Sequence, residues 1–226
     1  MTSTNASLRI AVLASGRGSN LNALIEARRD SKSPFEIVLV ASDKAHAPAL
    51  RSAEEAGIPT VALDPRGYPD RASFDTDLFA RIAEYTPDLV VLAGFMRILD
   101  PAALAPWIGR TINIHPSLLP KYRGLRTHER ALATGDTTHG ASVHFVTSEL
   151  DGGPVIAQVE MPIGGDDTAA SIAARLLPDE HRLLVACVGL IAERRIALEG
   201  DVVRLDGRPL VVPLKLSSDG TFDVPA

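Results

Sequence analysis

An amide, an imidazole and a carboxylate are the side chains of this sequence whose types and spacing suit joint chemistry. Asn113 and His115 occupy alternate positions of a predicted strand in TINIHPSLLPKYRG, residues 111–124. Side chains alternate along a strand with a period of two, so both should lie on one face. Asp151 precedes two glycines in SELDGGP, a loop that we expect to fold back over the end of that strand. The three favour stabilisation of an oxyanion and transfer of a proton.

The sequence does not suggest a covalent nucleophile. Cys187 is the only cysteine and lies in RLLVACVGLIA, an apolar segment typical of a buried helix. Ser117 follows Pro116 and lacks the Gly-x-Ser-x-Gly surroundings of a nucleophile elbow. We therefore expect direct transfer from one substrate to another. On spacing alone, a core histidine that merely bonds a loop carboxylate explains His115 equally well.

A second candidate site is the turn in ASGRGSNL, where Gly16 and Gly18 separate a predicted strand from a predicted helix. Glycines let a ligand approach the backbone closely, and free amides at a helix start favour a phosphate. Asp43 stands where the dinucleotide fingerprint has its ribose-binding acid, but Leu21 replaces the third glycine. The turn favours a mononucleotide or sugar phosphate. A purely structural turn and an NAD-dependent oxidoreductase are the alternatives.

A third candidate is LAGFMRIL, residues 92–99, in which an apolar strand ends at Gly94. Methionine and aliphatic side chains at a strand end can line a slot for a flat ring. Taken alone, the segment is better explained as part of the hydrophobic core.

The remaining histidines suggest no metal site. His46 and His139 are expected in loops or at strand edges, and His144 alternates with Ser142 on a strand. No pair has the spacing of a metal site with a third ligand nearby, so we predict no metal. We expect His128, which follows the proline-rich loop, to contact residues of the site rather than a substrate.

Short apolar strands alternate with helices over the first half of the chain. This order predicts an α/β fold with a mostly parallel sheet and helices on both faces, whose ligands bind beyond the carboxyl ends of the strands. Antiparallel strands should follow in GASVHFVTSELDGGPVIAQVEMPI, then a long helix at roughly 167–195 and a small hairpin. We predict a single domain over 1–226, with a core at about 8–200 and a small hairpin and tail at 201–226.

Composition and charge limit the classes of partner that we expect for this chain. The 226 residues carry a net charge of −5, and no block of Lys and Arg suggests a nucleic-acid or membrane partner. The N-terminus has no apolar stretch of the signal-peptide type, and the longest apolar run is too short to span a bilayer. We expect a cytoplasmic protein that acts on small molecules. The sequence leaves the oligomeric state open, with a homodimer among the alternatives.

Four segments together resemble the phosphoribosylglycinamide formyltransferase family: VLASGRGSNL, VVLAGFMRIL, NIHPSLLPKYRGL and HGASVHFVTSELDGGPVI. The likeness follows the same order almost without gaps from about residue 8 to 200. It implies a Rossmann-like formyltransferase fold and a role in purine biosynthesis. The implied reaction moves a formyl group from 10-formyltetrahydrofolate, a co-substrate, to the amine of glycinamide ribonucleotide.

The resemblance also implies residue roles. The implied catalytic residues are Asn113, His115 and Asp151. The ribonucleotide would be bound by Gly18, Ser19 and Asn20 at its phosphate, and by Glu180 at its ribose or glycinamide part. The folate would contact Arg71, Met96, Arg97, Ile98, Leu99, Asn113, Thr147 and Asp151, the last two within the loop 147–151. In the family, the bond that matches Leu119–Pro120 is cis.

Three positions depart from the family pattern. Arg123 replaces a frequent proline, Arg126 stands where many members have a histidine, and Leu177 replaces a polar residue. These changes leave the catalytic trio intact and concern the phosphate and ribose contacts.

Two related enzymes and a non-catalytic binding protein are the alternatives to this functional interpretation. Methionyl-tRNA formyltransferase needs a further basic domain for tRNA, and this acidic chain is expected to end soon after the catalytic domain. Formyltetrahydrofolate hydrolase carries a regulatory domain ahead of the catalytic one, whereas the first strand here begins near residue 8. A non-catalytic nucleotide-binding protein would leave Asn113, His115 and Asp151 unused.

Overall fold

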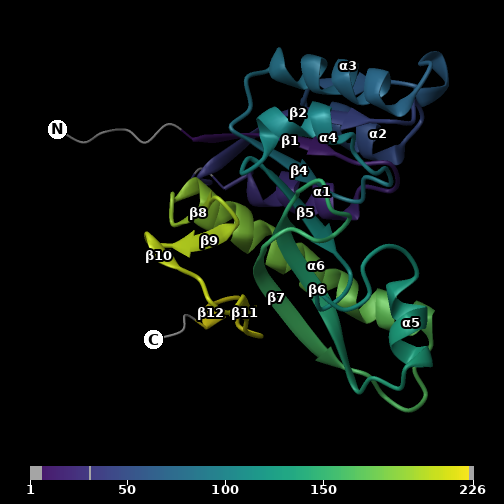
Figure 1. Cartoon of the computed structure of the whole chain (residues 1–226), viewed down its shortest axis with the longest axis vertical. Coiled ribbons are helices and arrows are strands. Elements are labelled where there is room, and N and C mark those ends of the chain that lie inside the picture. The colour runs from purple at the N-terminus through teal and green to yellow at the C-terminus, as the bar shows by residue number, and fades with distance from the viewer. Residues whose placement is uncertain (1–6, 31, 224–226) are drawn as a thin grey trace. The chain divides into compact units, whose positions relative to one another are not determined.

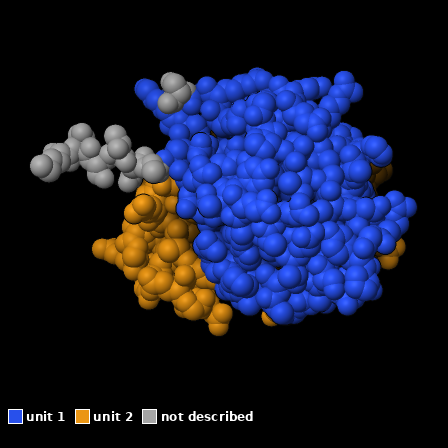
Figure 2. Space-filling view, turned by 90° about the horizontal axis from the view of Figure 1, so that it is seen from above, with its two compact units in different colours: residues 1–110 blue, residues 111–226 orange. Residues whose placement is uncertain are grey.

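The structure, a computed structural model, describes residues 7–30 and 32–223 (Figure 1). The chain forms two compact units, residues 1–110 and 111–226, which Figure 2 distinguishes by colour. Each unit contributes its own strands and its own buried apolar side chains.

The first unit is an α/β layer structure built on a parallel sheet. Its strands lie in the order β4-β1-β2-β3, and every pairing among them is parallel. The strands are β1 (Leu8–Leu13), β2 (Phe35–Ser42), β3 (Thr60–Ala62) and β4 (Leu89–Leu92). The helices are α1 (Ser19–Ala27), α2 (Pro48–Glu55), α3 (Arg71–Ala83) and α4 (Pro101–Leu104), with short 3₁₀ turns η1 (Pro65–Gly67) and η2 (Ala105–Trp107). All of β4 is buried, as expected for a strand covered on both faces.

The second unit combines a mixed sheet with one long helix. The sheet order is β12-β11-β7-β6-β5, with antiparallel β5–β6 and β6–β7 pairs and a parallel β7–β11 pair. Its strands are β5 (Thr111–His115), β6 (Thr138–Phe145), β7 (Val155–Pro162), β11 (Leu214–Leu216) and β12 (Phe222–Asp223). A separate antiparallel sheet contains β8 (Ile196–Glu199), β9 (Val202–Leu205) and β10 (Arg208–Pro209). The helices are α5 (Thr127–Ala133) and α6 (Ala169–Ala192).

Helix α6 packs against β6 and β7 through an apolar stripe. Thr168 and Ser171 form a reciprocal capping box that satisfies backbone donors at the helix start. The buried apolar side chains fall at helical spacings of three, four or seven residues, as one helix face requires: Ile172, Leu176, Leu183, Leu184, Cys187 and Val188. Burial raises the pKa of the Cys187 thiol. Among the helices of the described residues, none has the length and apolar character needed to cross a bilayer.

The sequence predicted most of this architecture, but it did not predict the β11 and β12 strands and it misplaced a histidine. The parallel first half, the antiparallel β6–β7 pair, the long helix and the β8–β9 hairpin are all present. His139, expected in a loop or at an edge, is wrongly placed: it lies inside β6 and is 1% exposed. Its Nε2 lies 2.9 Å from Nδ1 of His128 on α5, which covers it. Burial and the neighbouring His128 lower the pKa of His139 to about 4.

The buried His139 should make stability depend on pH. Above its ordinary pKa of 6.5, His139 is neutral in the folded and the unfolded chain alike. Between 6.5 and about 4 the unfolded chain binds a proton that the folded chain resists, so the free energy of unfolding should fall by roughly 3 kcal/mol as the pH is lowered. Urea unfolding from about pH 7 to about pH 4.5 measures this slope. His139→Gln should flatten it and the exposed His46→Gln should leave it unchanged; an unchanged slope in His139→Gln would contradict the assignment.

Gly140 in β6 leaves no room for a side chain. A Cβ at this position would lie 1.9 Å from the carbonyl oxygen of Val159 and 2.7 Å from Cδ2 of Leu118. Gly140→Ala must therefore push the β6–β7 pair apart, and should lower the free energy of unfolding by about 1–3 kcal/mol. Gly165→Ala is the matched control, because a Cβ there meets no atom within 4 Å. Equal denaturation midpoints for the two variants would refute this account.

Candidate active site

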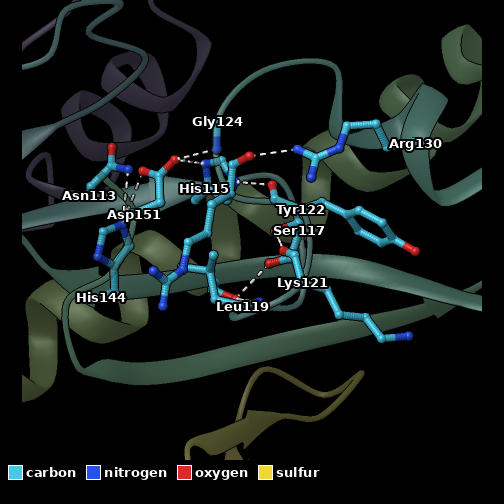
Figure 3. A network of polar contacts seen from close by, with 12 residues as sticks. Asn113, His115, Ser117, Leu119, Lys121, Tyr122, Gly124, Arg130, His144 and Asp151 are labelled. Carbon is cyan, nitrogen blue, oxygen red and sulfur yellow. Dashed lines mark hydrogen bonds and ion pairs between the residues drawn. The ribbon is translucent and has the colours of Figure 1, made fainter. Parts of the chain in front are cut away.

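The register of β5 against β6 brings the polar residues of the site together. Asn113 lies directly opposite His144, and His115 lies opposite Ser142. Neighbours on adjacent strands share a face, so the side chains of Asn113 and His144 meet above the sheet (Figure 3). Ile112 and Ile114 take the other face and are buried, as the alternation predicted.

His115 is held between a backbone carbonyl and a carboxylate. Its Nε2 lies 3.0 Å from the carbonyl oxygen of Tyr122, which can only accept, so Nε2 carries a hydrogen. Its Nδ1 lies 3.5 Å from Oδ2 of Asp151. The two side chains are only 8% and 11% exposed. The ring therefore has a polar neighbour at each of its two nitrogens.

Asp151 reaches His115 because its loop is tied to the segment after β5. The backbone of Asp151 has a φ of 47°, in the left-handed region, which turns its side chain back toward the strand end. Its Oδ2 accepts a hydrogen bond of 2.8 Å from the backbone N–H of Gly124. An ion pair between Arg123 and Glu149 joins the same two segments. The loop thus folds back as predicted, and Arg123, a departure from the family pattern, is part of its attachment.

His144 fixes the orientation of the Asn113 amide. Its Nδ1 donates to the carbonyl oxygen of Phe145 at 2.9 Å, and its Nε2 lies 3.1 Å from Nδ2 of Asn113. Burial lowers the pKa of His144, so the ring is neutral and Nε2 accepts from the amide. Nε2 is also 3.8 Å from Oδ1 of Asp151. Burial outweighs the pull of that carboxylate on the pKa.

Sequence reasoning gave His144 no part in the site. The signal that could have identified it is the antiparallel pairing of SVHF with TINIH, which sets the two histidine-bearing strands side by side. That register depends on a loop whose length and turns the sequence pattern did not specify.

The loop that follows β5 is fastened to β6 and β7. Ser142 donates from Oγ to the carbonyl oxygen of Ser117 at 2.6 Å and accepts from the N–H of Leu119 at 3.0 Å. Gln158 donates to the carbonyl oxygen of Leu119 at 2.9 Å. The Leu119–Pro120 bond is cis, as the family resemblance implied. These bonds satisfy backbone groups that a loop over a sheet would otherwise leave unpaired.

The residues predicted to bind the ribonucleotide phosphate gather at the start of α1. Gly18 has a φ of 76°, and a Cβ there would lie 2.7 Å from Cβ of Ala49, so only glycine fits. Ser19 and Asn20 form the first turn of the helix. Glu180, predicted to contact the ribose or glycinamide part, belongs to the second unit and is buried on α6.

The residues predicted to bind folate have different environments. Met96 and Ile98 are 68% and 50% exposed, whereas Leu99 is buried in the core. The Arg97 guanidinium lies 4.5 Å from the centre of the Phe74 ring. Arg71 begins α3, and its guanidinium is 4.0 Å from the Asp100 carboxylate. Thr147, in the second unit, is half-buried in the loop that ends at Asp151.

Metal ligands do not gather anywhere in residues 7–30 and 32–223. Within these ranges, no group of three His, Cys, Asp or Glu side chains is placed to hold an ion. The side chains of the described site can donate hydrogen bonds, stabilise charge and transfer protons.

Comparison with known proteins identifies relatives over most of the chain. The formyl transferase family model matches residues 8–188. Phosphoribosylglycinamide formyltransferase of Escherichia coli K12 is 46% identical over 90% of this chain and 96% of its own length. The human trifunctional purine biosynthetic protein adenosine-3 is 43% identical over 84% of this chain, which spans 19% of that protein. The structure of the Coxiella burnetii phosphoribosylglycinamide formyltransferase matches with a TM-score of 0.86 and 45% identity, over 91% of this chain and 96% of that one.

These relatives confirm the resemblance and the fold class inferred from the sequence. The family model runs through both compact units, and the Escherichia coli enzyme is matched nearly end to end. The chain belongs to the formyl transferase family, within its phosphoribosylglycinamide formyltransferase branch.

Proposed function

We propose that this protein transfers a formyl group from 10-formyltetrahydrofolate to the amine of glycinamide ribonucleotide in purine biosynthesis. The observation that carries this proposal is the network of Asn113, His144, Asp151 and His115, in a chain that is 46% identical to a relative named for this reaction. The network offers an amide donor, an imidazole and a carboxylate. These are the groups that a direct acyl transfer requires.

The reaction begins when the neutral amine of the ribonucleotide attacks the formyl carbon. A new C–N bond forms, and the carbonyl oxygen becomes an oxyanion. His144 accepts one hydrogen of the Asn113 amide, and we propose that the amide donates the other hydrogen to the oxyanion. Protonated His115, beside Asp151, supplies the opposing positive charge. Donors fixed before reaction stabilise the developing charge without reorganisation.

Proton transfer completes the reaction. The attacking nitrogen loses a proton, which we assign to Asp151, directly or through a water molecule. The oxyanion re-forms the carbonyl as the bond between the formyl carbon and N10 of the folate breaks. N10 takes up a proton as tetrahydrofolate leaves, which balances the proton lost by the attacking nitrogen. Two substrates held together make this a reaction within one complex, so positioning should supply a large part of the rate.

The binding roles belong to the same proposal. Gly18, Ser19 and Asn20 bind the phosphate, and this is supported by their place at the start of α1, where Gly18 has no room for a side chain. Glu180 binds the ribose or glycinamide part. The folate contacts Arg71, Met96, Arg97, Ile98, Leu99, Asn113, Thr147 and Asp151.

Three further predictions of the sequence are proposed with it. Residues 1–226 act as one formyltransferase domain, which is supported by a family model that continues through both units. A cytoplasmic location and assembly as a homodimer stay predictions.

A spectrophotometric transfer assay tests the function. Purified protein receives a 10-formylfolate donor with and without glycinamide ribonucleotide. Deformylation that requires the acceptor supports the proposal. Deformylation without acceptor indicates a hydrolase, and absence of turnover with retained ribonucleotide binding indicates a binding protein.

Loss of His115 or of the Asp151 charge should nearly abolish transfer. His115→Ala should lower kcat by about 10²–10⁴, because the imidazolium is lost. Asp151→Asn can still accept from the Gly124 N–H, so its loss of kcat reports the missing charge. Asp64→Asn, which removes an exposed pairing with Arg66, is the control and should retain full activity. Near-normal kcat in His115→Ala would refute the mechanism.

His144 should act on rate through Asn113. Asn113→Ala removes an oxyanion donor and should lower kcat by about 10²–10³. His144→Leu leaves the donor present but without its acceptor, so its loss should be smaller, about 10-fold. His144→Gln retains an acceptor oxygen and should recover part of that activity. Steady-state kinetics decide this, and equal activity of the Leu and Gln variants would contradict the role.

A further inference from the structure

The carbonyl oxygen of Tyr122 sets the orientation of the His115 ring. It accepts the Nε2 hydrogen at 3.0 Å, which leaves Nδ1 facing Asp151. If this oxygen moved away, the ring could rotate, or its neutral form could carry the hydrogen on Nδ1 instead. The orientation of His115 thus depends on what holds the Tyr122 backbone.

Tyr122 needs support from its side chain. Its φ is 57°, in the left-handed region that a residue with a bulky side chain rarely adopts unless its surroundings hold it. Its hydroxyl donates to Oδ2 of Asp136 at 2.7 Å and lies 2.5 Å from Oγ1 of Thr134. The Arg130 guanidinium lies 5.3 Å from the ring centre. Tyr122 and Arg130 are both drawn in Figure 3.

Asp136 also anchors the residue that precedes Tyr122. Lys121 donates from Nζ to both carboxylate oxygens of Asp136, at 3.1 and 2.9 Å. The hydrogen bonds from Lys121 and Tyr122 lower the pKa of Asp136, so it is ionised near neutral pH. One carboxylate, from the turn between α5 and β6, therefore holds two successive side chains of the loop that carries the Tyr122 carbonyl.

We propose that Asp136 is a positioning residue for His115, and that it acts through the hydroxyl and backbone of Tyr122. Asp136 itself need not touch a substrate. It holds the tyrosine so that the carbonyl oxygen captures Nε2, and the ring then presents Nδ1 to Asp151. The kinetic test of this proposal rests on the proposed function. The spectroscopic test needs only the His115 ring and no enzymatic activity.

The kinetic test compares variants of the pair. Asp136→Ala and Tyr122→Phe should each lower kcat on the order of 10-fold, with KM for both substrates little changed, because misplacement affects the reacting geometry. The double variant should lose no more than Asp136→Ala alone, because that change already removes the carboxylate to which the Tyr122 hydroxyl donates. Asp136→Asn keeps an acceptor for the hydroxyl and should recover most of the activity.

Asp206→Ala is the matched control for stability. Asp206 forms a two-contact ion pair with Arg195, as Asp136 does with Lys121, and its loss should leave kcat unchanged. Thermal unfolding of each variant separates a folding defect from a positioning defect. An equal loss of kcat in Asp206→Ala, or a kcat for Asp136→Ala and Tyr122→Phe that matches the wild type, would overturn the proposal.

Nitrogen-15 NMR of the histidine rings gives a readout that does not need activity. The His115 signals are assigned by their absence in His115→Ala. In the wild-type protein Nε2 should carry the hydrogen, and Asp136→Ala should add a population with the hydrogen on Nδ1 alone. Unchanged His115 signals in Asp136→Ala would overturn the inference even if the enzyme proved active. A wild-type protein without transfer activity but with the expected NMR change would refute the proposed function and retain the inference.

Discussion

The antiparallel register between β5 and β6 is the constraint on which the rest of the site depends. It sets Asn113 opposite His144 and His115 opposite Ser142. A slip of one residue would turn these side chains to the other face of the sheet, because strand side chains alternate with a period of two. Ser142 and Gln158 then bond the loop after β5, so the pairing that aligns the polar side chains also shapes the loop above them.

Two histidines of opposite character follow from this arrangement. His144 is buried, its pKa is lowered, and it serves as a neutral acceptor that orients an amide. His115 donates to a carbonyl oxygen with one nitrogen and faces a carboxylate with the other. The difference lies in their hydrogen-bond partners, because His144 Nε2 accepts from the Asn113 amide whereas His115 Nε2 donates to the Tyr122 carbonyl oxygen. The His144 ring thus orients the Asn113 amide, whereas the His115 ring is the one proposed to take part in the reaction.

Much of the fold followed from local patterns, and so did part of the site. Apolar strands that alternate with helices indicated the parallel sheet of the first unit, and period-two alternation placed Asn113 and His115 on one face. The two glycines after Asp151 indicated a turn back toward that strand. His144 and the Tyr122 carbonyl were missed, and His139 was placed at an edge although it is buried. The environments of these three groups depend on packing between segments that are distant in the sequence. Local periodicity does not predict such packing.

The sequence by itself determined the residue types available for catalysis, the class of fold and the family, because these depend on composition, periodicity and motif order. Only the tertiary structure decided which nitrogen of His115 faces Asp151, which ring orients Asn113, and which carboxylate holds Tyr122. Those choices follow from strand register and left-handed turns at Tyr122 and Asp151. Both are fixed by contacts between segments that are separated in the chain, and such contacts exist only once the chain has folded.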